Sequence, residues 1–250
     1  MPEGPSLVIL KEQTARFVGQ DIVRADGNVR AIDPARLAGQ PIVGLHTWGK
    51  HFLIETPDLI LRIHFLLFGT YRVDERRDKP PRLSLGMADG GEMNFYACAI
   101  RELSRAEFDA YDFTADVMAD AWDPKRARKK LRARPELLAC DALLDQDIFS
   151  GVGNIIKNEV LFRIRVHPLS TMGALPAPKL RALVDEARQY SFDFLAWKKQ
   201  FVLKQHWLAH AKKICPRCDI PFHKGKLGKS DRRSFWCERC QKRYDQKPVP

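Results

Sequence analysis

Four cysteines near the C-terminus constrain the fold of this 250-residue chain more than any other feature. They form two Cys-x-x-Cys pairs with 18 residues between them, Cys215 with Cys218 and Cys237 with Cys240. This spacing lets four thiolates surround one tetrahedral Zn²⁺ ion. Disulfides are disfavoured because no secretion signal is seen, and a redox pair would not need a second copy. The sequence therefore predicts a structural zinc finger that leaves no coordination position open for catalysis.

The positive charge of the chain is concentrated at its C-terminal end. The formal net charge is +11, and residues 198–250 hold 15 Lys and Arg against 4 Asp and Glu, whereas residues 1–197 hold 27 of each. Such asymmetry indicates a polyanionic partner, with nucleic acid as the first candidate. An anionic membrane is the competitor, but no apolar run is long enough to span a bilayer. We expect a monomeric cytoplasmic protein, nucleoid-associated if bacterial, neither secreted nor membrane-bound, with Cys98 and Cys140 as buried free thiols.

The order of hydrophobic patterns predicts an α+β multidomain chain. Helical spacing over residues 6–18 is followed by short β-type runs over residues 22–102, which predict an antiparallel β-sandwich with flanking helices. Helical patterns follow over residues 125–134, 136–144, 154–165 and 179–200. The predicted organisation is an N-terminal sandwich domain 1–119, a linker 120–124, a helical domain 125–210, a zinc-finger β-hairpin 211–245 and a tail 246–250.

The N-terminus, Met1-Pro2-Glu3-Gly4-Pro5, carries a possible nucleophile beside an acid. Removal of the initiator methionine leaves the secondary amine of Pro2 next to the carboxyl group of Glu3. An α-amino group has a reference pKa of about 7.7 to 8.0, so part of it is unprotonated near neutral pH and can attack a sugar C1′ or an aldehyde. The product is a cationic iminium, which promotes elimination at adjacent carbons. The alternative is that both prolines only stiffen an exposed terminus.

Two further segments have features of phosphate binding. A glycine-containing turn, Gly151-Val152-Gly153-Asn154, opens the predicted helix from residue 154, and helix N-termini bind phosphate through their amide groups. The glycines are equally compatible with a tight turn between helices. Basic residues also cluster between the two cysteine pairs, where a zinc-held hairpin can present them to phosphates. They are Lys224, Lys226, Lys229, Arg232 and Arg233.

Taken together, these motifs resemble the Fpg/Nei family of helix-two-turn-helix DNA glycosylases with AP lyase activity. The resemblance extends over nearly the whole chain and in the same order. It comprises the start Pro2-Glu3-Gly4-Pro5, the run Leu144-Asp145-Gln146 through Asn154, His167-Pro168 and the four-cysteine finger. It implies an N-terminal β-sandwich, a helical domain and a zinc finger, with DNA bound in the cleft between domains.

The resemblance also implies roles for single residues of the catalytic end. Pro2 would attack C1′ of the damaged nucleotide, expel the base and form the iminium. Glu3 would act as a general acid on the sugar ring oxygen and carry protons during elimination. Lys50, in Trp48-Gly49-Lys50-His51-Phe52, matches a family lysine that contacts phosphate and assists catalysis. From its own sequence context, Lys50 is only a lysine that begins a strand and is exposed.

The DNA-binding roles are carried over in the same way. Asn154 matches the asparagine that holds a phosphate, and Gly153 and Lys157 belong to the same predicted DNA-binding helix start. Arg232 stands five residues before the third cysteine, like the family's finger arginine, and Arg233 is its neighbour and rival.

A base removed from a duplex must first be flipped out, which leaves a void in the base stack. In the segment 64–69 the family pattern assigns Leu66, Leu67 and Phe68 as the wedge that fills this void. From hydrophobicity alone, a buried strand end is the better interpretation of the segment.

The residues that differ between the branches of this family resemble those of endonuclease VIII. Gly4-Pro5 matches that branch, and residues 95–100 provide no loop for the separate wedge of the formamidopyrimidine branch. Ser6 and Leu66 depart from the bacterial endonuclease VIII pattern, which leaves proton handling and opposite-base preference open. The sequence thus predicts a bifunctional glycosylase and AP lyase that removes oxidised bases, pyrimidines above all, from damaged duplex DNA and cuts by β,δ-elimination. The alternatives are an enzyme that prefers 8-oxoguanine or formamidopyrimidine, a non-catalytic damaged-DNA-binding protein, and a zinc-ribbon RNA-binding protein.

Overall fold

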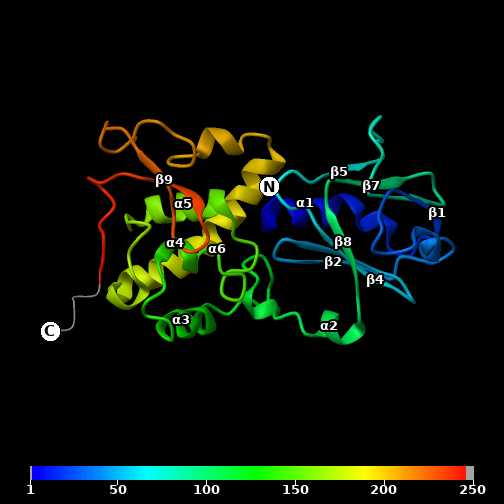
Figure 1. Ribbon diagram of the computed structural model, residues 1–250, viewed down its shortest axis with the longest axis horizontal. Helices are drawn as coiled ribbons and strands as arrows, with labels where there is room; N and C mark the ends of the chain where they lie inside the picture. Colours follow the sequence, from blue (N-terminus) through cyan, green and yellow to red (C-terminus); the bar gives the residue numbers. More distant parts are fainter. Residues whose placement is uncertain (1, 246–250) are drawn as a thin grey trace. The chain divides into compact units, whose positions relative to one another are not determined.

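The computed structural model describes residues 2–245, and the chain forms two compact units, residues 1–111 and 112–250 (Figure 1). The predicted domain boundary at residue 119 and the linker 120–124 therefore fall inside the second unit. Trp122 is buried in the core of that unit, and the Asp123 carboxylate accepts the backbone amides of Lys125 and Arg126 to cap a helix. The segment is thus packed structure instead of a linker. The predicted tail 246–250 lies outside the described residues.

Unit 1 contains two four-stranded antiparallel sheets, as the sequence predicts. One sheet has the order β1-β6-β7-β5 and the other β2-β3-β4-β8. The strands of the first are β1 (Ile22–Asp26), β6 (Leu83–Met87), β7 (Glu92–Tyr96) and β5 (Thr70–Val73). Those of the second are β2 (Gly44–Trp48), β3 (His51–Glu55), β4 (Ile60–His64) and β8 (Ala99–Leu103). Alternate residues of both sheets, such as Phe95 and Phe52, share one apolar core, so burial of these inner faces holds the sandwich together.

The first helix, α1 (Gly4–Thr14), continues as the 3₁₀ turn η1 (Ala15–Phe17), close to the predicted range 6–18. Leu7 and Leu10 of α1 enter the sandwich core, and the helix contacts β2 and β3. On the outer face of the second sheet lies α2 (Arg105–Asp109), whose Ser104 and Glu107 form a capping box. Another 3₁₀ turn, η2 (Pro34–Leu37), completes the helical elements described for this unit.

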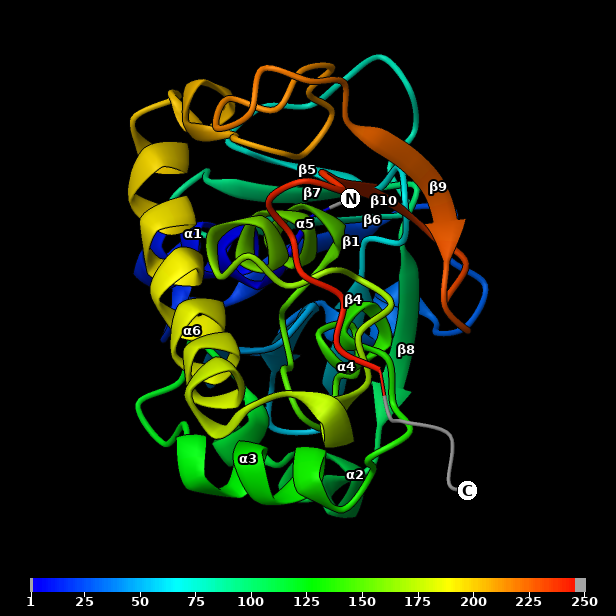
Figure 2. The same ribbon diagram turned by 90° about the vertical axis from the view of Figure 1, so that its left-hand side faces the viewer.

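Unit 2 is built around α5 (Asn154–Arg163) and the long α6 (Ala177–Lys199), which pack against each other (Figure 2). Its other helical elements are η3 (Phe113–Ala115), α3 (Pro124–Arg132), α4 (Ala139–Ala142), η4 (Met172–Ala174) and η5 (Leu203–His206). The helix predicted over 136–144 is reduced to the four residues of α4. Residues 137–139 instead exchange backbone hydrogen bonds with 170–172, including the Met172 amide to the Leu137 carbonyl at 2.9 Å. Long-range pairing therefore overrides the local helical pattern here.

The C-terminal part of unit 2 is a two-stranded hairpin, β9 (His223–Leu227) and β10 (Arg232–Trp236). A small separate core, which includes Phe162, Phe222 and Cys237, joins it to α5. Both views show α3 apart from this hairpin (Figures 1 and 2). Among residues 2–245, no helix has the length and apolar character needed to cross a bilayer.

Candidate nucleic-acid interface

The N-terminal amine and its neighbouring acid lie at the start of α1. Pro2 is half-buried, and Glu3 is 2 % exposed although it is charged in water. Glu3 stands at the N-cap of α1 with an extended backbone, and its carbonyl accepts the Ser6 amide at 2.8 Å. Its side chain does not cap the helix. A carboxylate at the N-terminus of a helix is stabilised by the helix dipole, and here it is held beside Pro2 by a rigid first turn that contains Pro5.

Lys50 lies in the two-residue turn between β2 and β3. Its sequence context predicted that it begins a strand, but it stands one position before β3. Gly49 precedes it with φ +54°, the left-handed conformation that this turn requires. The side chain is half-buried, not exposed. Burial, reinforced by the charges of Arg62 and Lys50, lowers the pKa of His51 to about 3, and similar causes lower the pKa of His64. Both imidazoles are therefore neutral at physiological pH.

Three consecutive apolar side chains are exposed in the turn between β4 and β5. Leu66 and Leu67 are both exposed, and Phe68 is 85 % exposed. Leu66 has φ +51°, and the Gly69 amide closes the turn on the Phe65 carbonyl at 2.7 Å. A Cβ on residue 69 would lie 2.1 Å from that carbonyl oxygen, so only glycine permits the turn. The interpretation as a buried strand end is wrong, and a group of exposed apolar side chains is typical of an interaction surface.

The connection after β7 is too short to carry a second wedge. Only Ala97 and Cys98 separate β7 from β8, and Ala97 has φ +49°. The prediction that this segment provides no additional loop is confirmed. Cys98 is buried, which raises the pKa of its thiol to about 11, and Cys140 is buried with a thiol pKa of about 11 for the same reason. Both are free thiols of low reactivity, as predicted.

In unit 2, the turn that leads into α5 is held by the side chain of Gln146. Its Nε2 donates to the carbonyls of Leu144 and Val152, and its Oε1 accepts the Gly151 amide at 3.1 Å. Gly151 has φ +96°, and Gly153 is the N-cap of α5. The turn predicted from its glycines is therefore a pre-ordered helix start. The role of Gln146 in fixing this turn was not predicted from the sequence, because its amide bonds only to the backbone of neighbouring residues.

Three side chains of α5 converge on one carbonyl of the finger hairpin. Asn154 Nδ2, Lys157 Nζ and Asn158 Nδ2 lie 2.9, 3.2 and 3.3 Å from the Arg233 carbonyl oxygen. Lys157 Nζ also donates to Ser234 Oγ at 2.8 Å. Lys157 is fully buried, so the predicted DNA-binding lysine instead ties α5 to β10. Asn154 remains half-exposed at the helix start.

The two candidate finger arginines lie on opposite faces of β10. Successive side chains of a strand alternate, so Arg232 shares a face with Ser234 and Arg233 points the other way. Ser234 is buried against Lys157 of α5, and both arginines are exposed. Arg232 is therefore on the face of the hairpin that is turned toward α5.

The four predicted cysteine ligands come together in unit 2. Their Sγ atoms all lie within 4.8 Å of one another, and the Cys215 and Cys240 sulfurs are 3.8 Å apart. Tetrahedral Zn²⁺ with Zn–S bonds of about 2.3 Å requires sulfur separations of about 3.8 Å. The four sulfurs thus fit a metal ion of this geometry, and the hairpin with both arginines lies between the two pairs.

A buried acid next to these residues has a structural function that the sequence did not reveal. The Glu159 carboxylate accepts the backbone amides of Leu208, Ala209 and His210, and it pairs with Arg163. These bonds fix the segment that leads into the finger. In the sequence, Glu159 is only one of several charged residues of a helix, so its burial was not predictable.

Comparisons with known proteins agree with this arrangement. The family model of the formamidopyrimidine-DNA glycosylase N-terminal domain matches residues 1–103. The model of the formamidopyrimidine-DNA glycosylase H2TH domain matches residues 113–191. Endonuclease 8-like 2 of Mus musculus is 34% identical, with 99% of this chain and 98% of that protein covered. The chain belongs to the Fpg/Nei family. Its fold also matches that of the Lactococcus lactis formamidopyrimidine-DNA glycosylase bound to DNA with an AP site, with a TM-score of 0.84 at 22% identity over 96% of this chain and all of that one.

Other relatives show how far the match extends. Endonuclease 8-like 2 of Bos taurus is 36% identical over 73% of this chain, but the chain spans only 58% of that protein's length. Endonuclease 8 2 of Mycobacterium bovis is 28% identical, with 97% of this chain and 100% of that protein covered. The Fpg/Nei assignment therefore covers both units, and the sequence-based identification of the family is confirmed.

Proposed function

We propose that the protein is a bifunctional DNA glycosylase and AP lyase that excises oxidised bases from damaged DNA. The single observation that carries the proposal is Glu3, a carboxyl group buried at the start of α1 directly beside Pro2. A buried titratable group next to an amine is a typical arrangement of a general acid and its nucleophile. The names of its relatives, endonuclease 8 and formamidopyrimidine-DNA glycosylase, support the same chemistry.

In the proposed reaction the unprotonated amine of Pro2 attacks C1′ of the flipped nucleotide, and the N-glycosidic bond breaks with the base as leaving group. The base takes up the proton that the amine nitrogen loses when it bonds to C1′. Glu3 gives its proton to the ring oxygen O4′, which opens the sugar and leaves a cationic iminium between nitrogen and C1′. Loss of a C2′ proton then expels the 3′ phosphate, and loss of a C4′ proton expels the 5′ phosphate. Water hydrolyses the iminium and restores the amine of Pro2.

The remaining residues bind and shape the DNA. Lys50 and the start of α5 at Gly153 and Asn154 would hold phosphates, and Arg232 would contact the backbone from the finger. Leu66, Leu67 and Phe68 would fill the void left by the flipped base. One Zn²⁺ on the four cysteines would supply the rigidity that the small finger core lacks. We propose a monomer that works on duplex DNA in the cytoplasm.

Oxidised pyrimidines are the proposed main substrates. The two-residue connection at Ala97 and Cys98 leaves no room for the separate wedge of the formamidopyrimidine branch. The second candidate is preference for 8-oxoguanine or formamidopyrimidine lesions. A panel of duplexes that differ only in the lesion decides between them: faster excision of an oxidised purine would support the second candidate.

Reductive trapping tests the proposed nucleophile. Borohydride converts the iminium into a stable amine, so incubation with a lesion-bearing duplex should give a covalent protein–DNA adduct whose DNA is attached at Pro2. A protein with one additional residue before Pro2 should bind the duplex but give no adduct and no strand cleavage. Full activity of that protein would refute Pro2 as nucleophile.

The variant Glu3→Gln separates the enzyme from a non-catalytic damaged-DNA-binding protein. The amide keeps the shape of the side chain but has no proton to donate, so base excision should fall by at least about 100-fold with DNA affinity retained. Glu3→Asp is the matched control, because it shortens the side chain and keeps the acid, and it should retain part of the activity. A Glu3→Gln protein with wild-type excision would contradict the proposed acid.

A further inference from the structure

A second basic surface lies on α3, apart from the finger hairpin (Figures 1 and 2). Residues 125–134 contain seven Lys and Arg and no acidic residue. Four of the seven are neutralised within unit 2. Asp112 lies 3.2 Å from Arg126 and 3.3 Å from Lys130, Asp145 lies 2.6 Å from Arg134, and Asp185 lies 3.9 Å from Arg128.

The other three basic residues form one stripe. Lys125, Lys129 and Arg132 are exposed, and within residues 2–245 none of them forms an ion pair. Spacings of four and three residues place them on one face of the helix. Each helical residue adds about 1.5 Å, so Lys125 and Lys129 are about 6 Å apart along the axis. The stripe is a short row of positive charges of the kind that follows a phosphate backbone.

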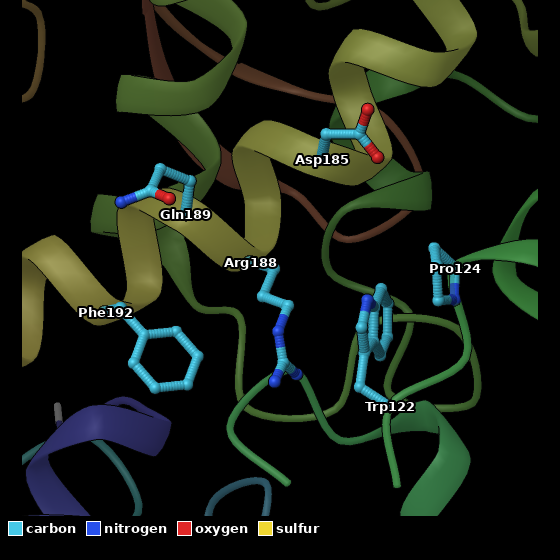
Figure 3. Close-up of a pocket in the computed structure, with 6 residues that line it drawn as sticks. All are labelled: Trp122, Pro124, Asp185, Arg188, Gln189 and Phe192. Atoms are coloured by element: carbon cyan, nitrogen blue, oxygen red, sulfur yellow. The ribbon is translucent and has the colours of Figure 1, made fainter. Parts of the chain in front are cut away.

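An aromatic pocket lies between the beginning of α3 and α6 (Figure 3), and Pro124 of its lining directly precedes Lys125, the first residue of the stripe. Its volume is about 410 Å³, within the usual range for small-molecule sites. Trp122 and Pro124 line it from the side of α3. Residues of α6 form the rest: Asp185, Arg188, Gln189 and Phe192.

The planar groups of the pocket are held in place. Figure 3 shows Arg188 extending between Phe192 and Trp122. Its Nη1 donates to the carbonyls of Val117 and Ala119 at 3.1 and 2.9 Å, which fixes the guanidinium, and its Cζ lies 5.0 Å from the centre of the Phe192 ring. Phe192 is 39 % exposed, unusual for a phenylalanine on a helix that packs into a core. A fixed guanidinium and an exposed aromatic ring together offer a stacking surface for a flat ring.

We propose that the α3 stripe and the Trp122–Phe192 pocket form a second nucleic-acid site, which takes single-stranded nucleic acid. A base would stack in the pocket against Phe192 and Arg188, and the adjoining phosphates would lie on Lys125, Lys129 and Arg132. Stacking on aromatic side chains beside a basic track is the usual way in which proteins bind single strands. Duplex DNA has no free base for the pocket. An acidic peptide is disfavoured because its carboxylate side chains offer no flat ring to stack against Phe192 and Arg188.

Binding of a fluorescent oligothymidylate about twelve nucleotides long, within the usual site size for single strands, tests the proposal. It is measured on the full chain with and without a saturating short duplex that carries a non-cleavable abasic-site analogue. We expect the single strand to stay bound when the duplex is present. The triple variant Lys125→Gln/Lys129→Gln/Arg132→Gln should lose at least about tenfold in affinity, and the slope of log K against log salt should fall by about two, since each single-strand phosphate contact contributes about 0.7.

Phe192→Ala provides an independent variant for the pocket. It should weaken single-strand binding between about 5- and 150-fold, the range for one lost stacking contact, with the salt slope unchanged. The matched control neutralises three exposed basic residues of unit 1, Lys11→Gln/Arg30→Gln/Lys79→Gln, and should change affinity less than about twofold. Thermal melting checks that each variant is folded.

Several outcomes would overturn the proposal. Complete displacement of the single strand by the duplex would show one shared site, and equal binding by the triple variant and its control would show a non-specific charge effect. Displacement by polyglutamate as readily as by an oligonucleotide of equal charge would point to acidic protein instead. A parallel titration with an oligouridylate of the same length compares RNA with DNA. Tighter binding of either strand supports the site and shows which of the two nucleic acids it prefers.

Discussion

Lys157 of α5 and Ser234 of β10 are joined by a hydrogen bond of 2.8 Å between Nζ and Oγ, and both residues are buried. The same ammonium donates to the Arg233 carbonyl. A long basic side chain near the N-terminal end of α5 thus connects the helix to the finger. This position makes Lys157 a structural tie between two elements that are expected to hold DNA, and not a ligand of DNA itself.

Replacement of Lys157 by Met tests that role. Met fills a similar volume but cannot donate, so Ser234 Oγ loses a buried partner, and the free energy of unfolding should fall by about 1 to 3 kcal/mol. Chelators should also remove the metal from the finger faster, because β10 is less firmly held. A phosphate ligand would behave differently: stability would be unchanged, and the salt slope of DNA binding would fall by about one. Lys157→Arg keeps the positive charge in a larger side chain. It would restore DNA binding if Lys157 contacted a phosphate, but it would not restore the stability that depends on the buried packing.

The opposite orientation of Arg232 and Arg233 predicts that they differ in function. Arg232→Ala should weaken binding to a lesion duplex by about tenfold or more and reduce the salt slope by about one, because one phosphate contact is lost. Arg233→Ala should have a smaller effect, since the contacts of α5 reach the backbone carbonyl of Arg233 and not its side chain. Equal losses for the two variants, measured by fluorescence anisotropy over a salt series, would contradict the assignment of Arg232 as the finger arginine.

The exposed tip at Leu66, Leu67 and Phe68 is expected to act only on paired DNA. Leu67→Ala and Phe68→Ala should lower kcat/KM for a lesion in a duplex by about tenfold, because the void left by the flipped base stays unfilled. Excision from a single strand, where no stack must be filled, should be almost unchanged. Val23 is also exposed in unit 1, so Val23→Ala is the matched control and should leave both rates as they are. A parallel loss on single and double strands would instead indicate a catalytic role for the turn.

Features that depend on local spacing were predictable from the sequence, whereas features that depend on contacts between distant residues were not. The cysteine spacing, the strands of the sandwich and the start of α5 were predictable because local spacing and periodicity determine them. The helix over 136–144 was not, because residues 137–139 pair with a segment more than thirty positions away. Burial of Lys157 and the exposure of Phe68 also depend on tertiary packing. For both residues the local sequence suggested the opposite surroundings.

Removal of one cysteine ligand should release the metal. Elemental analysis should find one Zn²⁺ per chain in the wild type and much less in Cys218→Ser, since an oxygen in place of one thiolate breaks the S₄ donor set. DNA affinity should fall with it, because the hairpin that carries Arg232 is no longer held. Cys98→Ser is the control: its thiol is buried in unit 1 and lies outside the four-sulfur cluster, so zinc content should be unchanged. Zinc retained by Cys218→Ser would contradict the predicted ligand set.

His51 should make the stability of the protein dependent on pH below neutrality. Burial lowers its pKa to about 3 in the folded chain, whereas the unfolded chain titrates at about 6.5. Below pH 6.5 the unfolded state therefore binds a proton that the folded state does not, and stability falls as the pH falls, by about 1.4 kcal/mol per pH unit for one histidine. Denaturant titrations between pH 4.5 and 6.5, within this window, should show a slope for His51→Gln that is smaller by about one proton. Tyr111→Phe is the control, because it removes the 3.0 Å contact of the tyrosine hydroxyl with His51 but keeps the aromatic ring that covers the imidazole. This variant should keep most of the slope. An unchanged slope in His51→Gln would show that other groups cause the pH dependence.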